Sequence, residues 1–162
     1  MSSLRKVEVG DIHYLHNINT RCLPENYPME FYLSIAIKYG DISWVAIDNS
    51  MKPIGYILLT LEPLPSSNIS NVSNDRNIEK SGYIASIAVM PEWRRNALAQ
   101  KLIDAALMSL GSIGVKSSHL HVRVGNQAAI SLYKKLGYVI ISTVSKYYKD
   151  NEDAFIMQKI IN

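Results

Sequence analysis

The spacing of apolar and polar positions predicts a strand and two helices in the first forty residues. Leu4 to Val9 alternates apolar and polar side chains, as a half-exposed strand does, and Asp11 then stands where a helix toward Cys22 would be capped. Prolines break this helix, and a second is expected from Met29 to Tyr39, ended by Gly40. The two helices should form a hairpin with a kinked connection.

The middle of the chain reads as strands around one irregular segment. Ser43–Ile47 and Pro53–Leu61 are β-rich runs separated by the turn-forming residues 48–52, which predicts two antiparallel strands. Residues 62–81 are rich in Pro, Ser and Asn, and this composition predicts a mobile loop within one domain. The continuous apolar run Gly82–Val89 predicts a central strand that is covered on both faces.

Helical and β patterns alternate in the second half. Apolar positions follow helical spacing from Leu98 until Gly111 and Gly114, and Asn126 stands where it can cap a second helix that Gly137 closes. Strands are expected at Ser118–Val124, Tyr138–Val144 and Ala154–Ile160. The whole order is one strand, two helices, three strands, helix, strand, helix and two strands, which predicts an α/β fold with a mixed sheet and helices on both faces.

Composition narrows the class of protein. The 162 residues, of which 48% are hydrophobic, suffice for one core, so residues 1–162 are expected to form a single domain. A net charge of +3 is too small and dispersed for a nucleic-acid surface, although a local anionic ligand fits. The single Cys22 gives neither a disulfide nor a metal cluster. Because no signal peptide or eighteen-residue apolar run is evident, we expect a cytoplasmic protein without a membrane segment.

One basic loop stands where an anion would bind. Arg94 and Arg95 lie between the apolar strand and the helix that opens at Leu98, so their charges join the unpaired N–H groups and dipole of a helix N-terminus. The small Ala97 and Ala99 would let a ligand approach the backbone. The alternative is a pair of solvated surface arginines.

The chain resembles the GNAT acetyltransferases, on the loop RRNALA (94–99) and the helix NQAAISLYKKLGY (126–138). Segments 23–27 (LPENY), 118–123 (SHLHVR) and 146–154 (KYYKDNEDA) resemble the catalytic subunits of NatA- and NatE-type protein N-terminal acetyltransferases. The similarity covers nearly the whole chain except the Ser/Asn-rich segment. It implies the GNAT fold, a mixed seven-stranded sheet with about four helices on both faces and splayed fourth and fifth strands.

The resemblance implies acetyl-CoA as cofactor, with its pyrophosphate on the basic loop and its pantetheine arm along the apolar strand. The family has glycine where this chain has Ala97, and if that position requires a positive φ the methyl group would weaken cofactor binding. The implied cofactor-binding residues are Ile87, Ala88, Val89, Arg94, Arg95, Asn96, Ala97, Leu98, Ala99, Gln100, Asn126 and Tyr133.

The same resemblance assigns catalytic roles. Tyr83 and His121 correspond to the pair that handles the amine proton through ordered water, and Tyr133 to the phenol that protonates the departing thiolate. His119 shares the face of His121 by the period of two but lies one pair further out, so we rank it lower. The alternatives are a strand-edge tyrosine, a structural histidine and a core residue of the last helix. No metal and no covalent enzyme intermediate are expected.

A substrate slot is implied at the first helix connection and the last hairpin. Its residues would be Leu23, Pro24, Glu25, Tyr27, Tyr147 and Tyr148, with the tyrosines gripping a peptide backbone. The predicted function is direct transfer of acetyl from acetyl-CoA to protein N-termini in a ternary complex, with an auxiliary subunit or the ribosome as further partners. The alternatives are a lysine or small-amine acetyltransferase, or a catalytically impaired CoA-binding module, and for the tyrosines an ordinary hairpin edge.

Overall fold

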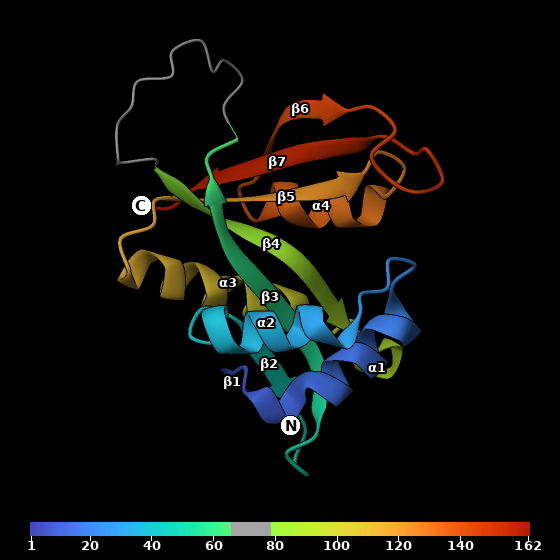
Figure 1. Cartoon of the computed structure of the whole chain (residues 1–162), viewed down its shortest axis with the longest axis vertical. Coiled ribbons are helices and arrows are strands. Elements are labelled where there is room, and N and C mark those ends of the chain that lie inside the picture. Colours follow the sequence, from blue (N-terminus) through green and yellow to red (C-terminus); the bar gives the residue numbers. More distant parts are fainter. Residues whose placement is uncertain (66–78) are drawn as a thin grey trace. The chain divides into compact units, whose positions relative to one another are not determined.

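The computed structural model describes residues 1–65 and 79–162, and in these it contains seven strands and four α-helices in the predicted order (Figure 1). Two short 3₁₀ turns, η1 (Val9–Asp11) and η2 (Pro91–Trp93), precede helices α1 and α3. The elements are β1 (Ser3–Lys6), α1 (Ile12–Cys22), α2 (Met29–Tyr39), β2 (Trp44–Ile47), β3 (Pro53–Pro63), β4 (Lys80–Val89), α3 (Leu98–Ser112), β5 (Ser117–Arg123), α4 (Gln127–Lys135), β6 (Val139–Val144) and β7 (Ala154–Ile160).

The strands of the described residues form one mixed sheet in the order β1-β2-β3-β4-β5-β7-β6. The pairs β1–β2, β2–β3, β5–β7 and β6–β7 are antiparallel, whereas β4 and β5 are parallel. Gly82 lies opposite Ser118 and Tyr83 opposite His119 in the parallel pair. The predicted mixed sheet and the central position of β4 are therefore confirmed.

Contacts within the chain divide it into two compact units. Unit 1 comprises Met1–Thr60 and Ile84–Ile113, and unit 2 comprises Leu61–Tyr83 and Gly114–Asn162. Strands β3 and β4 each contribute to both units. The expectation of a single domain over residues 1–162 stays a prediction.

One face of the sheet in unit 1 carries α1 and α2. Leu15 and Ile18 of α1 and Tyr32 and Ile35 of α2 are buried, as their spacing of three predicts for the inner side of a helix. They pack with side chains of the strands and their flanks: Val7, Val45, Ile47, Tyr56, Leu58, Ala88 and Met90. Neighbouring positions on β2 and β3, such as Ala46 and Ile57, are also fully buried, so the opposite face is covered as well.

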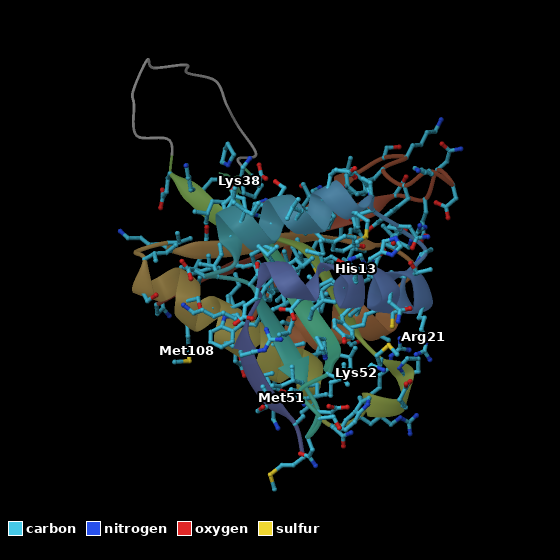
Figure 2. The ribbon with its side chains drawn as sticks, turned by 60° about the horizontal axis from the view of Figure 1, so that its bottom comes forward. His13, Arg21, Lys38, Met51, Lys52 and Met108 are labelled. Carbon is cyan, nitrogen blue, oxygen red and sulfur yellow. The ribbon has the colours of Figure 1, made fainter. Side chains whose placement is uncertain are left out.

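Helix α3 covers that opposite face. The Trp44 indole Nε1 donates to Ser109 Oγ at 3.0 Å, which ties β2 to α3. Figure 2 shows the outward sides of the unit, with His13 and Arg21 on α1, Lys38 on α2, and on α3 Met108, whose exposed fraction is 77%. Helices thus lie on both faces of this part of the sheet, as predicted. None of the described helices is both long enough and apolar enough to cross a membrane.

Unit 2 is built around β7, which pairs with β5 on one side and β6 on the other. Met157 of β7 is fully buried opposite Leu120 of β5. Tyr138 follows α4, and its hydroxyl donates to Ser118 Oγ at 2.9 Å. Because the hydroxyls of these two buried residues satisfy one another, they add no unpaired polar atom to the core.

Asp11 departs from its predicted role. It occupies the N-cap position of α1, but its side chain makes no cap hydrogen bond to that helix. Its two oxygens accept from Arg5 Nη1 and Nη2, both at 2.8 Å, and the carboxylate also accepts from Glu8 N at 2.9 Å. A bidentate guanidinium is a stronger partner than a backbone N–H, so the carboxylate braces β1 and η1 instead.

Several element limits also differ from the predictions. Strand β1 ends at Lys6, and Gly111 lies inside α3, where helical packing outweighs its low propensity. The segment predicted as a loop over 62–81 is shorter at both ends, since β3 continues to Pro63 and β4 begins at Lys80. The rest of that loop prediction falls on 66–78, outside the described residues. Strand pairing thus extends past the point where apolar composition stops.

Candidate active site

The basic loop leads directly into the longest helix of unit 1. After η2 the chain passes through Arg94–Ala97, and the 15-residue helix α3 begins at Leu98. Lys101 N donates to Ala97 O at 3.0 Å, which opens the backbone ladder of the helix. The N–H groups of Leu98, Ala99 and Gln100 precede that bond and therefore have no partner within the helix.

The backbone of this loop is bent into an anion-binding shape. Arg95 has φ 65° and Ala97 has φ 55° and ψ 21°, so two residues of the loop are left-handed. Left-handed Ala97 is followed by Leu98, the first right-handed residue of α3, and such a pair turns its N–H groups to one side and forms a concave nest for an anion. With exposed Arg94 and Arg95 beside it, the loop fits a pyrophosphate, the group that the cofactor prediction requires.

Ala97 is a left-handed residue, as the substitution of the family glycine suggested it could be. A Cβ in that conformation costs roughly 1–2 kcal/mol, whereas glycine adopts it freely. The side chain itself is exposed, so the methyl group contributes no core packing in return.

We expect Ala97→Gly to raise the free energy of unfolding by about 0.5–1 kcal/mol, because strain relief exceeds the added entropy of the unfolded chain. Urea denaturation of the purified protein measures this. The matched control is Ala99→Gly, two residues further on inside α3, which should lower the same quantity by about 0.5–1 kcal/mol. Equal losses in both variants would contradict the strain at residue 97.

Arg94 has a structural task besides its charge. Its Nε donates to Val89 O at 2.9 Å and so braces the loop against the end of β4. The same carbonyl lies 3.6 Å from Cys22 Sγ, which donates a weak hydrogen bond. Of the three β4 residues expected along a pantetheine arm, Val89 therefore has its carbonyl engaged within the protein, while Ile87 is only half-buried.

The first helix connection is anchored to the core of unit 1. Tyr27 stacks on Phe31 with ring centroids 4.1 Å apart, and its hydroxyl donates to Ala85 O of β4 at 3.5 Å. Leu23 N donates to Asn19 O at 2.9 Å, and its side chain packs on the apolar cluster beneath α1. Pro24 is exposed and Glu25 is half-buried. Leu23 and Tyr27 are thus fixed in place, as a substrate-binding surface requires.

In unit 2, the side chains of Tyr83 and His121 are in contact. The His121 Nδ1 and the Tyr83 hydroxyl are hydrogen-bonded at 3.0 Å. Tyr147 lies flat against one face of the imidazole, with ring centroids 4.3 Å apart and planes 3° apart. Burial lowers the pKa of His121, so the ring is neutral at physiological pH. A neutral imidazole whose Nδ1 is engaged keeps Nε2 as the atom that can exchange a proton or bind water.

His119 differs from His121 although both lie on β5. Its Nδ1 is hydrogen-bonded to Ser81 Oγ at 2.8 Å, and the residue is 5% exposed. Burial, with a smaller contribution from His121, lowers the pKa of His119 to about 4, and Glu62 opposes the shift weakly. His119 is therefore enclosed in the protein, and its lower rank as a catalytic residue stays a prediction.

Two further predicted residues belong to helix α4, Asn126 as its N-cap and Tyr133 within it. Asn126 Oδ1 accepts from Ala129 N at 3.2 Å, so the predicted N-cap is confirmed. Tyr133 is buried, its ring 5.8 Å from that of Tyr138, and burial raises its pKa. Its phenol therefore stays protonated through the neutral range, so it can donate a hydrogen bond to an anion but does not act as a base.

Comparison with known proteins gives the family. A sequence model described as the acetyltransferase (GNAT) family matches residues 12–138. The chain belongs to the GNAT acetyltransferases. It is 36% identical over 159 residues to the N-alpha-acetyltransferase daf-31 of Caenorhabditis elegans, covering 97% of this chain and 81% of that protein. It is 35% identical over 158 residues to ard1 of Schizosaccharomyces pombe, the catalytic subunit of the N-terminal acetyltransferase A complex, covering 96% and 84%.

A comparison with solved structures gives the same family. Arabidopsis thaliana Naa50, in complex with the bisubstrate analogue CoA-Ac-MVNAL, has a TM-score of 0.81 and 25% identity, with 98% of this chain and 97% of that chain covered. The GNAT fold and the family inferred from the loop and helix motifs are therefore confirmed.

Sequence reasoning missed two residues of this GNAT protein that lie beside the predicted site residues. Arg123 bonds Asp150 and Glu152 beside the predicted Tyr147 and Tyr148. Ser81 was also missed as the partner of His119. One signal was available: Arg123 follows His121 by two residues and so shares its strand face. Among the described residues no group of three or more His, Cys, Asp or Glu side chains could hold a metal ion.

Proposed function

We propose that this GNAT protein transfers an acetyl group from acetyl-CoA to the α-amino group of protein N-termini. The observation that carries the proposal is the placement of His121, which is hydrogen-bonded to Tyr83 at 3.0 Å and covered by Tyr147, and whose pKa burial lowers. A chain related to N-alpha-acetyltransferases over nearly its whole length thus has a poised proton acceptor among its predicted substrate residues.

The cofactor would be held by the loop and helix N-terminus of unit 1. The N–H groups of Leu98, Ala99 and Gln100 and the charges of Arg94 and Arg95 complement a pyrophosphate, with left-handed Arg95 and Ala97 forming the bend on either side of Asn96. Ile87 and Ala88 offer backbone groups to the pantetheine arm, with Asn126 as a further polar contact. When bound, acetyl-CoA supplies the activated thioester that the amine attacks.

Proton handling falls to Tyr83 and His121. An α-amine has a pKa of about 8 and is mostly charged at neutral pH, so a proton must leave before it attacks. In the tautomer whose Nδ1–H donates to the Tyr83 hydroxyl oxygen, the His121 Nε2 accepts that proton, directly or through a water molecule. Burial raises the pKa of Tyr133, so its phenol stays protonated and donates a hydrogen bond that stabilises the departing thiolate.

Side chains of each unit would contact the peptide. In unit 1, Leu23 and Pro24 would contact the first side chain of the substrate, Glu25 would bias its charge, and the Tyr27 hydroxyl would bond the peptide backbone. In unit 2, the hydroxyls of Tyr147 and Tyr148 would bond the peptide backbone. Some relatives are catalytic subunits of larger complexes, as the Schizosaccharomyces pombe protein is by name. We therefore propose an auxiliary subunit, or the ribosome, as a partner of this chain in the cytoplasm.

The decisive experiment is a peptide panel with labelled acetyl-CoA. Peptides that differ in their first residue are offered with a free N-terminus and with the N-terminus chemically blocked, each containing one internal lysine. We expect label only on free N-termini, with turnover that depends on the first residue. Equal labelling of blocked peptides would instead identify a lysine acetyltransferase. Tight binding of acetyl-CoA without turnover on any amine would identify a CoA-binding module.

A further inference from the structure

The connection between β6 and β7 lies against one face of β5. Two successive tyrosines of this hairpin each cover a β5 residue: Tyr147 stacks on His121, and the ring of Tyr148 lies 4.0 Å from the guanidinium carbon of Arg123. His121 and Arg123 are two residues apart and therefore project from the same face. The two stacked pairs are thus neighbours, and Figure 1 shows the hairpin beside the carboxyl end of β5.

Arg123 also forms charged hydrogen bonds that hold the hairpin against β5. Its Nη1 donates to Asp150 at 2.8 and 3.0 Å and to Glu152 at 2.7 Å. The Arg123 side chain is only 20% exposed, so water screens these bonds less than those of an ordinary surface pair. One guanidinium thereby binds a ring and two carboxylates of the same short segment.

The hairpin backbone contains two left-handed residues that depend on contacts with their surroundings. Lys146 has φ 51° and Asn151 has φ 64°, both left-handed and neither glycine. Side-chain and backbone bonds hold these bends: Lys146 N donates to Asp153 Oδ1 at 2.8 Å, and Asn151 N donates to Tyr148 O at 2.9 Å. Strained residues persist only where surrounding contacts hold them, so loosening the hairpin would let Tyr147 leave His121.

Glu152 extends the same cluster to the start of α4. While Oε2 accepts from Arg123, Oε1 accepts from Gly125 N at 3.0 Å. Gly125 immediately precedes Asn126, the N-cap of α4. An added Cβ at Gly125 would lie 2.9 Å from that Oε1, so the approach of this turn to Glu152 is close.

We propose that Arg123 is a positioning residue that, through Tyr148, Asp150 and Glu152, sets the ring of Tyr147 over His121 and so controls peptide binding. The proposal rests on the proposed function, which makes His121 the proton acceptor and Tyr147 part of the peptide site. Arg123 itself touches neither the substrate nor the cofactor in this scheme.

The first test uses NMR of the ligand-free protein and needs no turnover. A ring stacked at 4.3 Å shifts the His121 ring signals upfield by its ring current. We expect that displacement to be lost in Arg123→Gln. The matched control is Arg5→Gln, which removes an equally charged bidentate pair, with Asp11, in unit 1. It should lower stability without moving the His121 signals.

The second test is kinetic. In Arg123→Gln the KM for the peptide should rise roughly tenfold, because a displaced binding group loses preorganisation, while the KM for acetyl-CoA stays within about twofold. Asp150→Asn is the second variant. Its carboxylate is 61% exposed, so its replacement should leave the fold intact and give the same changes in smaller degree.

Unchanged His121 ring signals in both variants would overturn the proposal, as would equal rises in the KM for peptide and for acetyl-CoA. If the wild-type protein acetylates no N-terminus, the proposed function fails on the wild type. The ring signals of Arg123→Gln then still decide whether Arg123 positions Tyr147.

Discussion

In the His121→Ala variant, kcat on a peptide with a free N-terminus should fall roughly 10²–10⁴-fold, the usual loss when a general base is removed. The imidazole is the group of unit 2 that is neutral, hydrogen-bonded on one nitrogen and covered by a predicted substrate residue. Binding of acetyl-CoA should change little, because the anion-binding groups lie in the loop of α3. Steady-state kinetics and calorimetry with the same protein separate the two effects.

The role of His121 as proton acceptor also predicts the direction in which the rate changes with pH. Only neutral His121 accepts a proton, so the wild-type rate should fall as pH decreases through the pKa of His121. Burial lowers that pKa below the ordinary value of about 6.5, so the acid limb of the profile should lie below pH 6.5. The limb should vanish in His121→Ala.

Two further variants test whether cofactor binding and catalysis depend on different residues. Arg95→Ala should weaken acetyl-CoA binding and leave kcat nearly unchanged at saturation, the reverse of His121→Ala. His119→Gln should keep the rate, since His119 is enclosed with Ser81. Parallel losses of kcat and of cofactor affinity in both the His121 and Arg95 variants would contradict the assignment.

Local signals in the sequence were sufficient for most of the fold. The bounds of α2 and β7 match the predicted residues, because each is a periodic run with clear limits. Asn126 and Gly137 cap and close α4 as predicted, since capping depends on a few adjacent residues. The left-handed conformation at residue 97 could also be anticipated, because the motif places glycine there.

Contacts between distant residues could not be predicted in this way. Arg123 and Glu152 are 29 residues apart, and no period or cap relates them. Asp11 was misjudged for a similar reason: its helix-capping position is visible in the sequence, but its partner Arg5 depends on how β1 meets η1. Such pairings follow from tertiary packing, which overrides local preference.

The different surroundings of His119 and His121 on β5 also depend on tertiary packing. The burial of His119 has a large expected effect on how stability depends on pH. His119 has a pKa of about 4 in the folded chain and about 6.5 when unfolded, so between these values the unfolded chain binds more protons. The contribution of His119 to the free energy of unfolding is therefore fully present above pH 6.5 and declines as pH falls toward 4. The whole pKa difference is worth about 3 kcal/mol, and about 2 kcal/mol after allowance for solvent screening.

Denaturation in urea at pH 7, 5.5 and 4.5 tests this in wild type and His119→Gln. Glutamine can keep a hydrogen bond to Ser81 Oγ but does not titrate, so the variant should lose less stability than wild type over this range. His121→Gln is the matched control, because its half-exposed ring contributes a smaller acid dependence of the same sign. If His119→Gln loses as much as wild type, buried His119 is not the source of the acid dependence. The titrating groups would then be carboxylates such as Asp150, whose pKa the backbone N–H of Glu152 and the Arg123 bonds lower, and whose protonation also favours unfolding.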